Sequence, residues 1–391
     1  MSTAKTAAPL RVLHLLSAFE GEGLAQTAVT VINRCRKGYS HALISADPAR
    51  RGAAAGFAKG VTASAPPGFP ALDRPFSLRH LQTLARGMQG FDLILTYGER
   101  PLDAALAHAL FGPGLGLAPL VHHAGHGVCG EDAGEQAVRR GLVGRWYRRL
   151  ALSRASAVIA PSPAAESMIL RDWHQPRGKV HLVRGGVDIA ALVARPRRDA
   201  LPRVIKRQGE KWLLALPATA DAQLAVVRAF AVLDDAWHLV LAGDGAARDA
   251  LIAEAMRLEI GHRLHFAGAL ADPAAVMALF DLVVLPEEAM HSDLPTQNAL
   301  IMAMAAGLAV IAPSGGAMPD LVGPENAAHL LAVGGSASER EQALSQKLAA
   351  LGANPSLRER MGEENRTRAR SEFDRAVMVE RLVALYSALL S

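Results

Sequence analysis

The chain is poor in cysteine. Its 391 residues include two, Cys35 and Cys129. Two cysteines do not make the disulfide framework of a secreted domain, and no cysteine or histidine spacing matches a zinc site. The sequence therefore predicts no metal ion and a reducing compartment, the cytoplasm.

Long apolar runs are also missing. The sequence has no uninterrupted apolar stretch of about 18 residues, the length that a membrane-spanning helix requires. The first ten residues, MSTAKTAAPL, lack the apolar core of a secretory signal. We expect a cytoplasmic protein without a spanning segment.

Aromatic residues make up 5% of the chain and are not interleaved with basic residues, which argues against nucleic acid as a partner. Positive charge is concentrated in the first half. Residues 1–190 hold 22 Lys and Arg against 13 Asp and Glu, whereas residues 191–391 hold 20 against 24. A basic half favours an anionic partner, such as phospholipid headgroups or a polyprenyl phosphate.

Short apolar segments alternate with longer helical patterns along almost the whole chain. Near-continuous apolar runs are typical of parallel strands that helices cover on both faces. The expected strands are residues 11–16, 41–46, 91–96, 119–123, 157–160, 179–183, 212–216, 238–242, 263–267, 281–285, 308–312 and 329–333.

This alternation predicts the α/β class, with two doubly wound, Rossmann-like domains. A stretch rich in Arg and Pro at residues 188–210 marks their connection, so we place the domains at residues 1–190 and 191–373. Residues 374–391 have the apolar period of a helix that crosses back to the first domain. Ligands of open α/β sheets bind at the carboxyl ends of the strands, which predicts a cleft where the two domains face each other.

Two glycines follow the first expected strand, in the sequence Phe-Glu-Gly-Glu-Gly-Leu at residues 19–24. Gly21 and Gly23 let the backbone approach a ligand, and the helix that follows offers unpaired N–H groups to a phosphate. A tight turn between strand and helix without any ligand explains the same residues.

Three histidines, His122, His123 and His126, cluster at the end of the strand expected at 119–123. Imidazoles suit a metal ion, but no nearby carboxylate spacing supports one. A structural role and a hydrogen bond to a polar ligand both remain open.

Arginines gather in residues 139–149, with Trp146 and Tyr147 among them: Arg139, Arg140, Arg145, Arg148 and Arg149. As a helix, this segment is basic and amphipathic with interfacial aromatic residues, which favours a membrane surface. The alternative is a solvated basic face with a core-facing Trp. In the first case the protein lies peripherally on the inner face of the cytoplasmic membrane.

The most specific motif is the block at residues 298–307, Asn-Ala-Leu-Ile-Met-Ala-Met-Ala-Ala-Gly, which an apolar strand and Ser314-Gly315-Gly316 follow. It resembles the donor-binding helix of the family 4 (group 1) glycosyltransferases, which commonly reads Asn-Ala-Leu-Leu-Glu-Ala-Met-Ala-Cys-Gly. The stretch from His122 to Asp188 is similar to a bacterial branch that makes envelope polysaccharides and glycolipids.

The resemblance implies the GT-B fold, with a nucleotide-sugar donor on the second domain and a glycan or lipid-linked acceptor on the first. It implies a retaining transfer without a metal ion, with His126 and Asp293 as the catalytic residues. It assigns the donor site to Gly21, Gly23, Thr219, Gly268, Leu270, Ser292, Leu294, Asn298 and Met302. The acceptor or membrane face falls on His123, Arg139, Arg140, Arg145, Arg148 and Arg149.

The sequence departs from the family's pattern where the donor is held. The usual Arg falls at Leu216 or Pro217 and the usual Lys at Asp221, while the two glutamates fall at Leu294 and Met302. Two functions follow. The first is a divergent glycosyltransferase, and the alternative is a catalytically inactive glycosyltransferase-like protein that acts as partner or regulator of an active one. A sugar-nucleotide epimerase is disfavoured, because both halves resemble the transferases.

Overall fold

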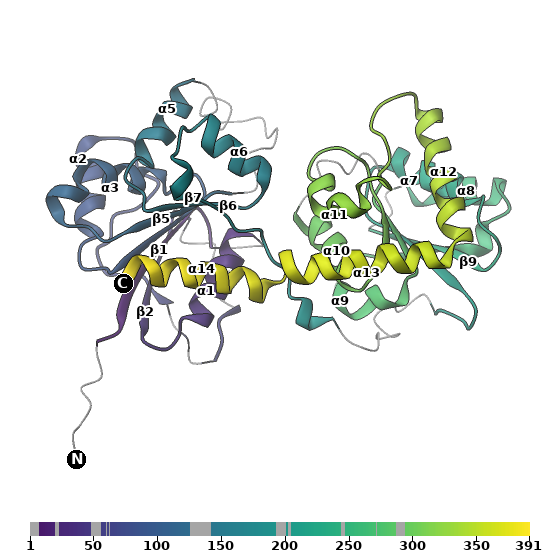
Figure 1. Ribbon diagram of the computed structural model, residues 1–391, viewed down its shortest axis with the longest axis horizontal. Coiled ribbons are helices and arrows are strands. Elements are labelled where there is room, and N and C mark those ends of the chain that lie inside the picture. Colours follow the sequence, from purple (N-terminus) through teal and green to yellow (C-terminus); the bar gives the residue numbers. More distant parts are fainter. Residues whose placement is uncertain are drawn as a thin grey trace, which may run out of the picture. The chain divides into compact units, whose positions relative to one another are not determined.

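The computed structural model describes residues 8–19, 23–47, 56–59, 61, 63–125, 142–192, 201, 205–243, 247–270, 272–286 and 294–391. The chain divides into two compact units (Figure 1). The first unit is Met1–Gly185 with Ala376–Ser391, and the second is Gly186–Arg375. Sequence analysis placed the boundaries nearby, at 190/191 and 373/374.

The first unit contains a parallel sheet of seven strands in the order β3-β2-β1-β4-β5-β6-β7. The order reverses beside β1, as in doubly wound folds. The strands are β1 (Leu10–Leu16), β2 (Tyr39–Ser45), β3 (Ala63–Ser64), β4 (Leu93–Tyr97), β5 (Leu120–His123), β6 (Ala157–Ala160) and β7 (Val180–Leu182).

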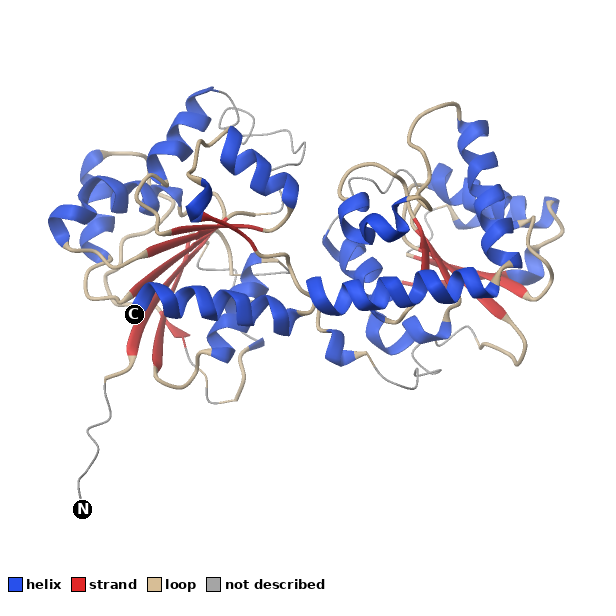
Figure 2. Ribbon diagram, in the orientation of Figure 1, coloured by secondary structure: helices blue, strands red, loops and turns tan. Residues whose placement is uncertain are grey.

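Helices cover both faces of this sheet (Figure 2). Along β1, Leu13 and Leu15 face one apolar layer, whereas Val12 and Leu16 face the other, because successive side chains of a strand point to opposite faces. The helices are α1 (Leu24–Arg34), α2 (Leu78–Gly87), α3 (Leu102–Leu115), α5 (Leu142–Ala151), α6 (Pro163–Arg171) and α14 (Arg375–Leu390).

The last helix of the chain, α14, packs on the first unit. Its buried side chains Met378, Val379, Leu382 and Tyr386 share an apolar cluster with α1 and with one face of the sheet. In Figure 1, α14 (yellow) lies beside α1 (purple), although the two helices are at opposite ends of the sequence. The predicted return of the chain to its first domain is confirmed.

The second unit has a parallel sheet of five strands in the order β10-β9-β8-β11-β12. The strands are β8 (Lys211–Ala215), β9 (Trp237–Ala242), β10 (Leu264–Gly268), β11 (Leu282–Val284) and β12 (Ala309–Ile311). The helices are α7 (Ala220–Phe230), α8 (Arg248–Arg257), α9 (Pro273–Val276), α10 (Leu294–Ala305), α11 (Met318–Ala327), α12 (Ala337–Ala353) and α13 (Pro355–Glu372). The predicted class, two doubly wound parallel α/β domains, is confirmed.

Two strand predictions differ from the structure. Residues 329–333 form no strand: Leu331 makes an isolated bridge to Pro313, and the backbone then turns at Gly334 and Gly335, which both have positive φ. The short edge strand β3 was not predicted, because two residues give no period to recognise. Among the helices that the structure describes, none combines the length and the apolar character that a membrane-spanning segment needs.

Candidate active site

The carboxyl ends of β1, β4 and β5 meet at one edge of the first unit. Ser17 follows β1, and its hydroxyl group donates to the Tyr97 carbonyl at 3.4 Å and accepts from the Arg100 amide at 3.2 Å. The Gly98 amide donates to the His123 carbonyl at 2.9 Å, which joins the ends of β4 and β5. We call Ser17, Gly23, Leu24, Gly98, Glu99 and Gly125 the first-unit edge.

Helix α1 begins at this edge without a side-chain cap. Its N-cap residue is Gly23, with φ 79° and ψ −119°, a conformation that only glycine adopts readily. The Leu24 side chain lies against the positions where Gly98 and Gly125 would carry a Cβ, at 3.3 and 3.6 Å. A helix N-terminus without a side-chain cap suits an anion, and the assignment of Gly23 to the donor site stays a prediction. Gly21 lies outside the described residues.

Directly beneath the first-unit edge, five buried polar side chains form a hydrogen-bonded network. The Nε2 atom of His41 donates to the Cys35 carbonyl at 3.1 Å, because a carbonyl only accepts. In the neutral ring Nδ1 of His41 then accepts from Nε2 of His14 at 3.0 Å, and Nδ1 of His14 accepts from the Tyr97 hydroxyl at 3.1 Å. Burial lowers the pKa of both His14 and His41, which favours the neutral rings that this order of bonds assumes.

The network continues to His123. The Tyr386 hydroxyl donates to the Tyr97 oxygen and accepts from Nε2 of His123, 2.7 Å away. Burial lowers the pKa of His123 to about 3, and burial also lowers the pKa of His14 and raises that of Tyr97. The prediction that His123 lies on an acceptor or membrane face is wrong, since its side chain is 2% exposed and belongs to the core.

A second polar cluster joins α5 to the edge. Nη2 of Arg148 lies 2.6 Å from the Glu99 carboxylate, and the Arg148 guanidinium stacks over Trp173 at 5.4 Å. The neighbouring Tyr147 hydroxyl donates to Asp103, in the first turn of α3. His122 lies below, with Nδ1 2.9 Å from the Thr96 hydroxyl, and burial lowers its pKa to about 3.

The arginines that were predicted for an exposed basic face fall into a buried group and an exposed group. Arg148 is buried and paired, so its assignment to that face is wrong. Arg145 and Arg149 are exposed, and the Arg149 guanidinium lies 5.0 Å from the ring centroid of Trp146. Arg139, Arg140 and His126 lie outside the described residues. On its outer side, α5 presents two basic side chains with the exposed Trp146 and Leu150.

The second unit has a corresponding edge at the carboxyl ends of its strands. Thr219 caps α7 by accepting from the Ala222 amide at 3.5 Å. The Gly243 amide donates to the Gly268 carbonyl at 2.9 Å, and both glycines have positive φ, which allows the close turn. We call Thr219, Gly243, Gly268 and Leu270 the second-unit edge.

Helix α10 carries the block on which the resemblance rests. Asn298 is half-buried in the second turn of this helix. Leu294 begins the helix, and Ser292 and Asp293 lie outside the described residues. Nothing in the described contacts assigns a ligand to Asn298, so its role in the donor site stays a prediction.

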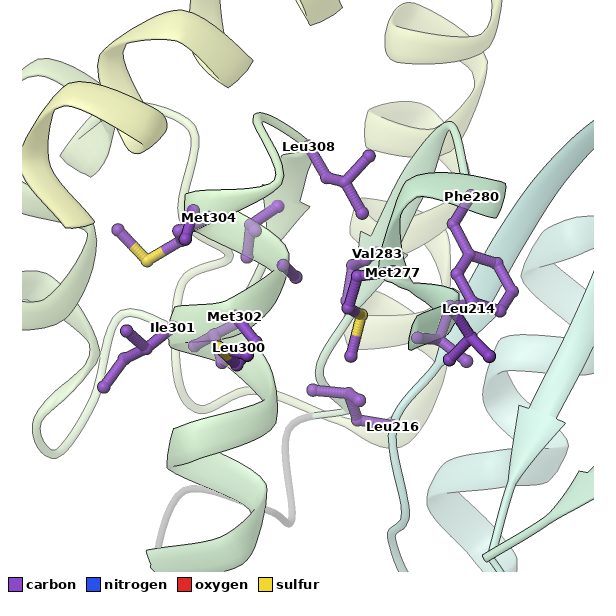
Figure 3. Close-up of a cluster of buried hydrophobic side chains, with 14 of the residues drawn as sticks. Leu214, Leu216, Met277, Phe280, Val283, Leu300, Ile301, Met302, Met304 and Leu308 are labelled. Atoms are coloured by element: carbon purple, nitrogen blue, oxygen red, sulfur yellow. The ribbon is translucent and has the colours of Figure 1, made fainter. Parts of the chain in front are cut away.

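Met302 lies in an apolar core (Figure 3). Its side chain is 8% exposed and shares a cluster with Leu216, Met277 and Leu300, against which Leu270 also packs. Figure 3 shows Met302 on α10 and Leu216 on the segment that leaves β8. The prediction that the Met302 side chain contacts the donor is therefore wrong, because the side chain is enclosed by apolar neighbours.

Comparison with known proteins matches both halves of the chain to glycosyltransferases. The model described as Glycosyltransferase Family 4 matches residues 22–191. The model described as Glycosyl transferases group 1 matches residues 213–354. The chain belongs to the family 4 (group 1) glycosyltransferases. Members of this family use nucleotide-sugar donors, and the resemblance that the sequence indicated is confirmed.

A curated relative is the MMP alpha-(1→4)-mannosyltransferase of Mycolicibacterium hassiacum, 28% identical over 340 residues that span 82% of this chain and 75% of the relative. Solved structures share the GT-B fold. A glycosyltransferase from Rickettsia africae matches with a TM-score of 0.69 at 14% identity and covers 98% of this chain and 99% of its own. HepE of Anabaena, in complex with UDP and glucose, matches with 0.64 at 19% identity, covering 97% and 100%.

The resemblance implies an Arg and a Lys at the donor diphosphate, and this chain has neither at the matching positions. Three other cations of the second unit are placed by the structure. Lys211 starts β8, at the opposite end of the sheet. Arg228 is engaged by Glu254 at 2.6 Å and Glu341 at 3.6 Å. Arg248 is the first residue of α8, and its guanidinium lies 4.2 Å from the ring centroid of Phe266 on β10.

Arg248 thus lies at the carboxyl ends of β9 and β10, near Gly268 of the second-unit edge. Sequence analysis did not single out Glu99 or Tyr386, because each depends on a contact between segments far apart in the chain. Within the described residues, no three His, Cys, Asp or Glu side chains are grouped so as to hold a metal ion.

Proposed function

We propose that this chain transfers a hexose from a nucleotide-sugar donor to a glycan or lipid-linked acceptor, with retention of configuration. The reaction belongs to the synthesis of a bacterial envelope polysaccharide or glycolipid, and it needs no metal ion. The donor site comprises Asn298 with the second-unit edge, and His126 and Asp293 are the catalytic residues. The protein lies peripherally on the inner face of the cytoplasmic membrane.

The uncapped start of α1 at Gly23 is the observation that carries this proposal. A retaining transfer expels a nucleoside diphosphate, and negative charge develops on that group as the bond to the sugar breaks. Amide N–H groups at a helix N-terminus stabilise such charge without a metal ion. The loop that precedes α1 follows the central strand β1, at the edge where open α/β sheets bind ligands.

The relatives support a hexose as the transferred sugar and a uridine or related nucleotide in the donor. One relative is a mannosyltransferase, and HepE was solved with UDP and glucose. The second-unit edge offers backbone groups at Gly243 and Gly268, which recognise a nucleotide without a particular side chain. Arg248 is the described cation best placed to compensate for the replaced Arg and Lys.

A second candidate is a catalytically inactive protein that binds an active transferase. The burial of Leu216 and Met302 in one apolar cluster favours it, since the family has a Glu at the position of Met302 and an Arg at that of Leu216 or Pro217. Asp221, which replaces the Lys, is an exposed anion at the start of α7. An anion there repels a diphosphate.

Ligand titration separates the two candidates. The full chain is titrated with UDP-, GDP-, ADP- and dTDP-sugars while thermal unfolding is followed. Binding at 100 times the dissociation constant stabilises the folded chain by about 2.7 kcal/mol, so one nucleotide is expected to raise the Tm. Asn298→Ala is expected to reduce this shift, and Gln342→Ala, an exposed amide on α12, serves as the matched control.

Transfer itself is measured with the stabilising nucleotide-sugar and a lipid-linked or oligosaccharide acceptor. The proposal is supported if the nucleoside diphosphate is released, if EDTA does not change this release, and if His126→Ala abolishes it. Such a result indicates an active transferase that needs no metal ion. No stabilisation by any nucleotide at millimolar concentration, together with no release, overturns it and leaves the inactive partner.

A further inference from the structure

The last residues of β4 and β5 support the first-unit edge from below. Tyr97 and His123 are partners in the parallel register, and their rings stack with centroids 4.5 Å apart. The residues that follow them, Gly98 with Glu99 and Ala124 with Gly125, leave the sheet as the edge itself. The orientation of these two rings therefore fixes where both edge segments begin.

One hydroxyl group from the end of the chain holds both rings. Tyr386 on α14 lies 2.7 Å from Nε2 of His123, a contact between residues 263 positions apart, and it also hydrogen-bonds Tyr97. The Tyr386 ring meets the His123 ring edge-on, with centroids 6.2 Å apart. All three side chains are at most 3% exposed, so bulk water does not reach this hydroxyl group.

The order of donors and acceptors in the network gives the Tyr386 hydroxyl group one defined role. Tyr97 donates its own proton to His14, so it can only accept from Tyr386. Tyr386 must then accept from the N–H group of His123. Removal of the hydroxyl group leaves that N–H group buried without a partner, and a buried unpaired polar group drives the ring to rotate or its strand end to open.

We propose that Tyr386 is a positioning residue for the first-unit edge: through His123 and Tyr97 its hydroxyl group sets the ends of β4 and β5 so that Glu99 and Gly125 meet the acceptor. The site on the first unit is therefore completed by the last helix of the chain. The identity of the ligand rests on the proposed function, whereas the positioning of the strand ends does not.

Amide hydrogen exchange tests the positioning on the full chain. In Tyr386→Phe, the amides of Gly98 and Ala124, which bond the His123 and Ile159 carbonyls, are expected to exchange about tenfold faster. Tyr39→Phe is the matched control, because Tyr39 packs against the same apolar cluster and the network does not include its hydroxyl group. Equal exchange at Gly98 and Ala124 in the two variants overturns the proposal.

Kinetics test the consequence for the acceptor. Tyr386→Phe is expected to raise the KM for the acceptor about tenfold and to leave hydrolysis of the donor in the absence of acceptor within twofold of wild type. A parallel fall of transfer and hydrolysis, or no change in either, overturns the acceptor role. If the wild-type chain neither transfers nor hydrolyses, the proposed function fails, and the exchange comparison still decides whether Tyr386 positions the edge.

Discussion

Arg148 and Glu99 form an ion pair in which Nη2 lies 2.6 Å from the carboxylate and the Arg148 side chain is 9% exposed. The pair joins α5 to the residue that follows β4 and Gly98. Burial distinguishes Arg148 from the exposed Arg145 and Arg149 of the same helix. The ion pair holds Glu99, a residue of the first-unit edge, in one position.

The first prediction concerns this pair. Glu99→Gln removes the carboxylate charge beside the buried Arg148 guanidinium, and we expect the free energy of unfolding to fall by about 2–4 kcal/mol. Glu363→Gln is the control, because its pair with Arg366 has a similar distance of 2.7 Å but a 65% exposed carboxylate. That variant is expected to change stability by less than about 1 kcal/mol. Equal losses in urea unfolding would show that the Arg148 pair is not buried in solution.

The second prediction tests whether Met302 belongs to the core. Met302→Glu restores the family's carboxylate but buries it among Leu216, Met277 and Leu300, so we expect a loss of at least about 3 kcal/mol and no gain in nucleotide binding. Met302→Leu is expected to cost less than about 1.5 kcal/mol. Thermal unfolding with and without UDP-sugar measures both effects. A stable Met302→Glu chain that binds the donor more tightly would place residue 302 in the site.

How far sequence predicts this fold depends on the range of the interactions. Apolar runs located eleven strands, including β1 and β8, because burial on both faces of a parallel sheet requires such runs. Gly23 was identified correctly as the turn before α1, since a positive φ is a local requirement that glycine records in the sequence.

Side-chain roles were harder to predict. His123 and Arg148 carry polar groups that mark a surface in sequence patterns, yet partners on distant elements, Tyr386 and Glu99, allow their burial. Met302 stands at the position of a donor-site glutamate of the family, but its side chain is apolar and is buried in the core. A single sequence does not record which distant partner satisfies a buried polar group.

The third prediction concerns acidic pH. His122 and His123 have an ordinary pKa of 6.5 and a folded-state pKa of about 3, mainly because burial disfavours the charged ring. Below pH 6.5 the unfolded chain binds protons that the folded chain does not, so stability is complete above that pH and falls as the pH decreases towards 3. At pH 5 each histidine lowers the free energy of unfolding by about 2 kcal/mol.

Urea unfolding at pH 7.5 and pH 5.0, followed by amide exchange in β4 and β5, measures this loss in the first unit. His174→Asn is the control, because it removes an exposed imidazole at a positive φ that Asn tolerates and leaves His122 and His123 in place. An unfolding free energy that is the same at both pH values would mean that the histidines are protonated, or exposed, in the folded chain.

The fourth prediction concerns the contact between α13 and the end of α10. A Cβ atom on Gly362 would lie 2.0 Å from the Gly307 carbonyl oxygen, which is backbone and cannot rotate away. Gly362→Ala is therefore expected to destabilise the second unit by about 2–3 kcal/mol. Gly114→Ala on α3 is the control, since no atom lies within 4 Å of its Cβ position and alanine favours the helix. Similar Tm values for the two variants would contradict the close contact.

The fifth prediction concerns the outer side of α5, where Arg145 and Arg149 are exposed beside Trp146 and Leu150, which are 65% and 51% exposed. Lipid-linked acceptors lie at the membrane, and anionic headgroups attract each nearby arginine by about 1 kcal/mol. At low salt, vesicles containing phosphatidylglycerol are expected to bind the chain, and phosphatidylcholine vesicles are not. The double variant Arg145→Ala with Arg149→Ala is expected to bind roughly thirtyfold more weakly.

Trp146→Ala is expected to weaken the same binding, because an indole ring lies at the level of the headgroups. Met256→Ala on α8 controls for the loss of any exposed apolar side chain, since Met256 is 69% exposed on the second unit. Added salt is expected to release the wild-type chain, as the Debye length falls to about 3 Å at 1 M. Equal sedimentation with both kinds of vesicle, or equal weakening by Met256→Ala, would show that α5 does not bind an anionic surface and would leave its arginines as a solvated face.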